Sequence, residues 1–83
     1  MGELSKLINI SKVSESKLNA VGINTISEFK TLGSREAYLR VRTYDDTACI
    51  CMLYGFEGAI QGIKWHMLPK SVKKELLKFY NEL

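Results

Sequence analysis

The chain has 83 residues, of which 46% are hydrophobic and 25% are charged, and its formal net charge is +3. These proportions are typical of one small globular domain, and they exclude a disordered chain and a multidomain enzyme. No apolar run approaches the ~20 residues that a membrane-spanning helix needs. The N-terminal sequence contains no long apolar stretch, and the chain has two cysteines. We therefore expect no signal peptide, no disulfide scaffold and a cytoplasmic protein.

The pattern predicts one all-α domain over residues 1–83, compact, with five or six helices punctuated by glycine. The first segment, 3–7, is long enough for one or two helical turns. A longer helix should follow and reach about Val21. Ser11 or Ser14 can cap it, because a hydroxyl accepts a hydrogen bond from an unpaired N–H of the first turn. Gly22 stands where a left-handed residue ends a helix.

Two short helices are predicted next. Thr25 and Glu28 have the spacing of a capping box, in which each side chain bonds the backbone N–H of the other. The helix that they open should end at Gly33. Ser34 then caps a second helix over residues 35–43.

The longest apolar segment, 47–61, predicts a central buried helix that Asp45 or Asp46 caps and Gly62 ends. Its two interior glycines cost about 2 kcal/mol against alanine in an isolated helix, so close approach of a neighbouring helix should offset them. The sequence leaves open whether the stripe packs within one molecule or forms the seam of a homodimer. The small residues of this stripe are Cys51, Gly55, Gly58, Ala59 and Gly62, with Ala48 at its start.

A connector and a final helix complete the chain. Trp65 and Leu68 are expected to anchor the connector, and Pro69 suits the first position of the helix. One face of that helix is basic and is either a solvated face or a secondary surface for nucleic acid. The basic face consists of Lys70, Lys74 and Lys78, and the apolar face of Val72, Leu76, Phe79, Tyr80 and Leu83.

Few residues point to catalysis or metal binding. Cys49 and Cys51 would point away from each other on a helix, which favours two small buried side chains over a metal or redox site. His66 lacks a partner nucleophile, and no glycine-rich phosphate loop is present. We therefore predict no enzyme and no cofactor. The rival hypothesis is a small enzyme or ligand-binding domain that uses Tyr54, Trp65 and His66.

Residues 7–12 and the helix after them have the layout of a helix-hairpin-helix. Such a hairpin places backbone N–H groups and a helix N-terminus against a phosphate. Ser11, Lys12 and Lys17 are the candidate nucleic-acid contacts. The alternative is a turn that only packs two short helices together.

Several motifs occur in the order found in a known family. The chain resembles the C-terminal domain of the TfoX/Sxy family, regulators of bacterial natural competence, from about Leu4 to Tyr80. The most specific part is residues 57–62 together with Trp65. The motifs are Asn9-Ile10-Ser11, Leu18-x-x-Val21-Gly22-Ile23, Gly33-Ser34-Arg35-Glu36-Ala37-Tyr38, the run 53–62, and Trp65-x-x-Leu68-Pro69.

The resemblance implies a helix-hairpin-helix or SAM-like fold in a cytoplasmic bacterial protein. Longer family members join this domain to an N-terminal α/β domain, and some act with the cyclic-AMP receptor protein at competence promoters. We therefore expect a non-catalytic module of transcription-linked regulation that binds a protein partner or, weakly, DNA. It would be a monomer or a homodimer. The alternative is a structural or self-associating accessory domain.

Overall fold

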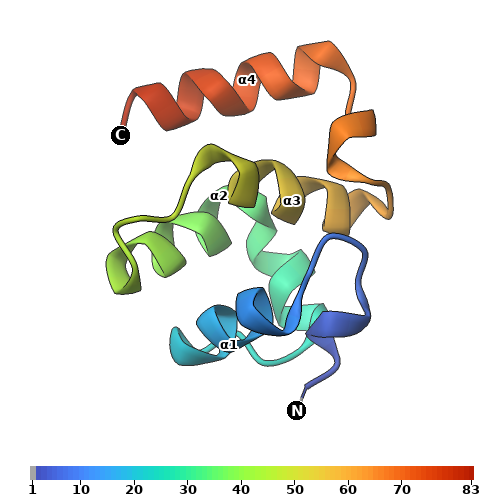
Figure 1. The fold of residues 1–83 in the computed structure, drawn as a ribbon, viewed down its shortest axis with the longest axis vertical. Helices are drawn as coiled ribbons and strands as arrows, with labels where there is room; N and C mark the ends of the chain where they lie inside the picture. The colour runs from blue at the N-terminus through green and yellow to red at the C-terminus, as the bar shows by residue number, and fades with distance from the viewer. Residues whose placement is uncertain (1) are drawn as a thin grey trace.

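The computed structural model describes residues 2–83 and confirms an all-helical, compact domain with no strand in that range. Figure 1 shows α1 and α4 at opposite ends of the molecule, with α3 and part of α2 between them. The structure has four α-helices rather than the five or six helices predicted, together with two short 3₁₀ turns. The elements are η1 (Leu4–Lys6), α1 (Lys12–Ala20), α2 (Ile26–Tyr44), α3 (Ile50–Gln61), η2 (Trp65–Met67) and α4 (Lys70–Asn81).

Helix α1 begins and ends at the residues that the sequence indicated. The Ser11 hydroxyl accepts a hydrogen bond of 3.1 Å from the N–H of Ser14. At the other end, Gly22 has a φ of 85°, which a residue without a Cβ adopts at little cost. The N–H of Ile23 then donates to the carbonyl of Leu18 over 2.9 Å, as in a Schellman motif. Both apolar side chains are fully buried, so this turn also anchors α1 to the core.

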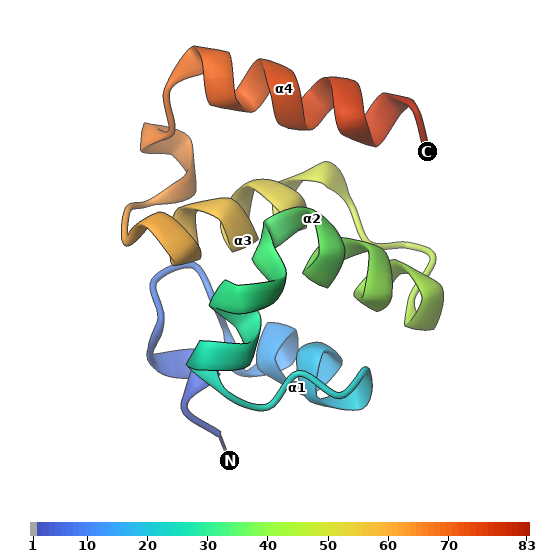
Figure 2. The ribbon, with the colours of Figure 1, turned by 180° about the vertical axis from the view of Figure 1, so that it is seen from behind.

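The two short helices predicted for residues 26–43 form one bent element, α2. Its capping box is present, with Glu28 N–H donating to Thr25 Oγ1 over 3.0 Å. Inside the element Gly33 has non-helical angles of φ 85° and ψ 166°. The predicted break is therefore a kink, visible in Figure 2, and the count of separate helices falls by one.

Helix α3 begins later than predicted, because Asp45 does not cap it. Asp45 instead ends α2, and its carboxylate accepts a 3.0 Å hydrogen bond from the N–H of Thr47 in the turn that follows. The helix starts at Ile50, with Cys49 in the N-cap position. Gly62 ends it in the left-handed conformation, as predicted.

The core forms where α3 packs against both α2 and α4 (Figures 1 and 2). The rings of Phe29 and Phe56 meet edge to face at 5.4 Å, and both side chains are almost fully buried. Burial of each such side chain contributes about 1.5–3 kcal/mol. The Tyr38 hydroxyl satisfies its polar end by donating to the Ala48 carbonyl over 2.6 Å. The predicted central helix is thus confirmed as the element on which α2, η2 and α4 pack, whereas α1 packs on α2.

Helix α4 rests on α3 and is also held by arginines of α2. The Arg35 guanidinium lies 5.7 Å from the Phe79 ring centroid, and that of Arg42 lies 5.6 Å from the Tyr80 ring centroid. Leu83, predicted to lie on the apolar face, is 49% exposed, because α4 ends at Asn81 and the terminal residues turn out of the helix.

Candidate nucleic-acid interface

The loop before α1 is held in place by Asn9, which has a left-handed φ of 71°. Its side-chain amide donates to the Ile63 carbonyl over 2.9 Å and, more weakly, to the Gly55 carbonyl over 3.4 Å. Its Oδ1 accepts a 3.2 Å hydrogen bond from the N–H of Trp65. The start of the chain is thereby tied to the segment after α3. In the sequence Asn9 stands out only as part of a motif, although a polar residue between two isoleucines could have indicated this role.

The glycine stripe of α3 lies against this loop, and not against a neighbouring helix as predicted. A Cβ on Gly58 would lie 2.5 Å from Asn9 Nδ2 and 2.7 Å from the Ile63 carbonyl oxygen. The stripe therefore packs within the molecule along part of its length, and a homodimer seam stays a prediction. Of the predicted stripe, Gly55, Gly58 and Ala59 are buried, whereas Cys51 and Gly62 are exposed.

The N-terminus of α1 is an exposed helix end. Lys12 is exposed, and Ile8 and Val13 beside it are 37% and 65% exposed. The Ser11 hydroxyl accepts a hydrogen bond from the N–H of Ser14. The other N–H groups of the first turn have no hydrogen-bond acceptor within the helix. The acid of that turn, Glu15, is only 5% exposed. The exposed surface of this helix end therefore consists of a lysine, a hydroxyl, backbone N–H groups and two apolar side chains, and its one acid, Glu15, is buried.

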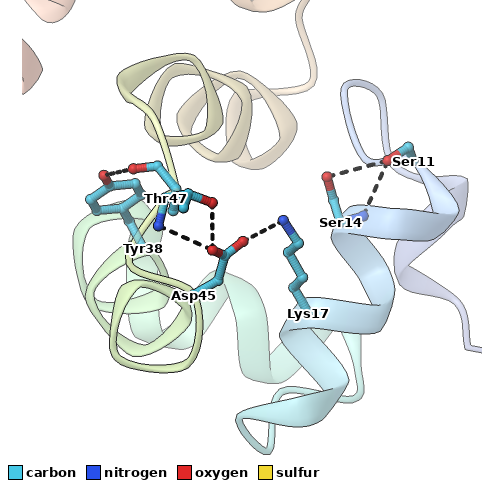
Figure 3. A network of polar contacts seen from close by, with 7 residues as sticks. Ser11, Ser14, Lys17, Tyr38, Asp45 and Thr47 are labelled. Atoms are coloured by element: carbon cyan, nitrogen blue, oxygen red, sulfur yellow. Dashed lines mark hydrogen bonds and ion pairs between the residues drawn. The ribbon is translucent and has the colours of Figure 1, made fainter.

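Lys17, the third candidate contact, forms an ion pair with Asp45. Its Nζ lies 2.6 Å from Asp45 Oδ2, in an ion pair that joins α1 to the turn between α2 and α3 (Figure 3). The hydrogen bond from Lys17, followed by those from Thr47, lowers the pKa of Asp45 to about 2. The structure thus brings Ser11 and Lys12 together at one end of α1 and binds Lys17 to a carboxylate.

The N-terminus of α2 is closed by carboxylates. Glu28 Oε1 accepts hydrogen bonds from the N–H groups of Asn24 and Thr25, and these bonds lower the pKa of Glu28. Glu3 Oε1 accepts a 2.7 Å bond from the N–H of Ile26. A phosphate would meet two carboxylates there that already bond N–H groups, whereas the first turn of α1 holds one acid, the buried Glu15, and this makes α1 the better anion site of the two.

The second predicted basic surface, on α4, lies at the end of the molecule opposite to α1 (Figure 1). Lys70, Lys74 and Lys78 are all exposed on α4, on the side away from the buried Leu76. Since α1 and α4 are far apart in Figures 1 and 2, the two predicted basic regions do not form one surface.

The cysteines are not buried, contrary to the prediction. Both are exposed, because α3 starts after Cys49 and its first turn faces solvent at Cys51. The N–H of Met52 is the main cause of a lowered pKa for the Cys49 thiol, whereas desolvation raises the pKa of Cys51. Within residues 2–83, no cluster of three or more histidine, cysteine or acidic side chains is arranged to hold a metal ion.

The residues of the rival hypothesis pack on one another. The rings of Tyr54 and Trp65 stack at 5.9 Å with an angle of 14° between their planes, and the His66 ring meets Trp65 edge-on.

Across the described residues, no helix has the length and hydropathy to cross a membrane.

The structure defines a small all-α domain with an exposed helix N-terminus at α1 and a basic face on α4. Residues 1–80 match the family model of the TfoX C-terminal domain, and the chain belongs to this family. It is 32% identical over 80 residues to Protein Sxy of Escherichia coli (strain K12). That match covers 96% of this chain but only 38% of Sxy, so the chain spans well under half of this relative.

Solved structures with the same fold come from Listeria monocytogenes. An uncharacterized protein in a triclinic crystal form is 48% identical, with a TM-score of 0.94, over 95% of this chain and 90% of the other. A protein of unknown function in a tetragonal form is also 48% identical, with a TM-score of 0.93, over 95% of this chain and 96% of that one.

Proposed function

We propose that this domain is a non-catalytic interaction module of transcription-linked regulation, of the competence-regulator type, and that α1 contacts the phosphate backbone of DNA. Membership of the TfoX C-terminal domain family supports the regulatory role. The observation that carries the DNA contact is the contrast between two helix N-termini. That of α1 is exposed beside Lys12, whereas that of α2 is closed by Glu3 and Glu28.

The chemistry of such a contact follows from the geometry of α1. Backbone N–H groups and the positive end of the helix dipole attract a phosphate oxygen, and Lys12 adds a full charge. Few phosphates fit against one helix end, so binding is weak, independent of sequence and salt-dependent. Ser11 keeps its cap in this arrangement, and Lys17 contributes only when it leaves Asp45.

A titration of a labelled DNA duplex, followed by fluorescence anisotropy between about 25 and 150 mM salt, tests the contact. Lys12→Ala should weaken binding about 3- to 10-fold and reduce the salt slope by about 1. Replacing Lys12 and Lys17 together should weaken binding further. The matched control is Lys30→Ala, which removes an exposed lysine of α2. No binding to any duplex at low salt, or an equal loss for Lys30→Ala, overturns the proposal.

A protein partner is the second candidate. The observation that favours it is a group of exposed apolar side chains among lysines at η2. Phosphates of DNA do not bind apolar side chains, whereas a protein partner can cover them.

A further inference from the structure

The turn η2 and the start of α4 carry exposed apolar side chains next to basic ones. Trp65 is 37% exposed and Met67 is 67% exposed. Lys64 precedes them, and Lys70 and Lys73 follow in the first turns of α4. We call these five residues the η2 patch. Exposed large apolar side chains grouped in one place indicate a binding surface more than single scattered ones do.

Contacts from three parts of the chain hold the η2 patch in shape. Tyr54 of α3 stacks on the Trp65 ring, and the Trp65 N–H donates to Asn9 of the N-terminal loop. Lys73 of α4 donates to the His66 carbonyl over 3.0 Å, and its Nζ lies 5.9 Å from the Trp65 ring centroid. A surface fixed in this way loses little conformational entropy when a partner binds.

The charge of this region identifies the kind of partner. Residues 62–74 contain four lysines and one histidine and no acidic residue, although the formal net charge of the whole chain is only +3. We propose that the η2 patch docks an acidic protein segment that carries at least one large apolar side chain. Its carboxylates pair with the lysines, and its apolar side chain covers Met67 and the exposed part of Trp65.

The geometry favours a protein over a nucleic acid here. Tyr54 stacks on the Trp65 ring and Lys73 lies over the ring as well, so little of the ring surface is left for a base to stack on. Met67 is an unbranched, adaptable apolar side chain, which suits contact with apolar side chains of a protein and gains nothing from phosphates. The inference rests on the proposed role as an interaction module, but it does not depend on the DNA contact of α1.

Selection from a random peptide library displayed on phage, against the immobilised domain, tests the proposal without a known partner. The selected peptides are then synthesised and titrated by fluorescence of Trp65, the sole tryptophan of the chain. We expect them to have net negative charge and at least one aromatic or large aliphatic residue. An absence of enriched peptides, or enriched peptides without acidic residues, overturns the proposal.

Two matched pairs of variants place the binding site. Met67→Ser and Lys64→Gln should each weaken peptide binding about 5-fold or more. Tyr44→Ser and Lys30→Gln remove a similarly exposed large or basic side chain outside both proposed surfaces and should leave binding unchanged. If the patch variant and its control lose peptide affinity equally, the peptide does not bind at the η2 patch.

The same variants separate this proposal from the DNA contact. Met67→Ser changes no charge, so its DNA affinity should equal that of the wild type while its peptide affinity falls. If DNA displaces the peptide and Met67→Ser weakens both equally, the η2 patch is a nucleic-acid surface and the docking proposal is wrong. If DNA binding is absent but the peptide result holds, the α1 contact fails alone.

Discussion

The side-chain amide of Asn9 donates a hydrogen bond of 2.9 Å to the carbonyl of Ile63, 54 residues further along the chain. This bond joins the loop before α1 to the segment before η2. Asn9 therefore links the segments that carry the two proposed surfaces, the N-terminus of α1 and the η2 patch. Because the bond is partly buried, water replaces it poorly when the side chain is lost.

Replacement of Asn9 should destabilise the domain. Asn9→Ala removes the side-chain hydrogen bonds and places alanine at a φ of 71°, so we expect a loss of about 2–3 kcal/mol in the free energy of unfolding. Asn9→Gly loses the same bonds but tolerates the φ, and should cost about 1 kcal/mol less. Urea unfolding followed by Trp65 fluorescence measures both. Equal stability of alanine and glycine variants would show that the backbone is not strained there.

The two glycines that face Asn9 should respond differently to alanine. In Gly58→Ala the new methyl group would meet the Ile63 carbonyl at 2.7 Å and the Trp65 Cα at 3.2 Å, and these backbone atoms cannot move away easily. We expect a loss of about 1–3 kcal/mol. In Gly55→Ala the nearest atoms are at 3.7 Å, so alanine should be neutral or stabilise the helix by up to about 1 kcal/mol. Thermal unfolding of the pair decides whether the close approach is real.

The Asp45–Lys17 pair should make stability depend on acid pH. Because the pKa of Asp45 is lowered from 3.8 to about 2, its contribution to stability is complete above its ordinary pKa and is lost as the pH falls from about 4 to 2. Asp45→Asn should lower the urea midpoint at neutral pH, and the difference from wild type should shrink toward about pH 2. A difference that stays constant across this range would mean that the carboxylate charge contributes nothing.

The two thiols should react at different rates. Both are exposed, so alkylation by iodoacetamide needs no denaturant. The lowered pKa of Cys49 gives it more thiolate near neutral pH than Cys51, whose pKa is raised, so Cys49 should react several-fold faster and at a lower pH. Cys49→Ser and Cys51→Ser variants, analysed by mass spectrometry, assign each rate. Faster reaction at Cys51 would contradict the placement of Cys49 at the start of α3.

Local signals in the sequence predicted the helix boundaries that depend only on residues close together in the chain. The side-chain capping box at Thr25 and the positive φ of Gly22 and Gly62 are such cases. The start of α3 could not be predicted in this way, since Asp45 had an alternative partner in Lys17, 28 residues earlier. The displaced boundary puts Cys49 in the N-cap position and Cys51 in the first turn of α3, and both thiols are exposed there.

The candidate site was predictable in part for the same reason. Ser11 and Lys12 lie at a helix start that a local capping pattern marks, so the sequence was enough to predict that they lie side by side there. The role of Asn9 depends on the chain returning after α3, and the pairing of Lys17 depends on α1 packing beside a distant turn. Contacts between segments so far apart leave no periodic signal in a single sequence.

Amide chemical-shift mapping shows directly whether α1 presents its N-terminus to DNA. A short duplex is titrated into the ¹⁵N-labelled domain at low salt. We expect the largest shifts on the amides of residues 11–14, and we expect these shifts to diminish in Lys12→Ala. Shifts confined to α4 around Lys74, or to the start of α2 at Thr25, would contradict it.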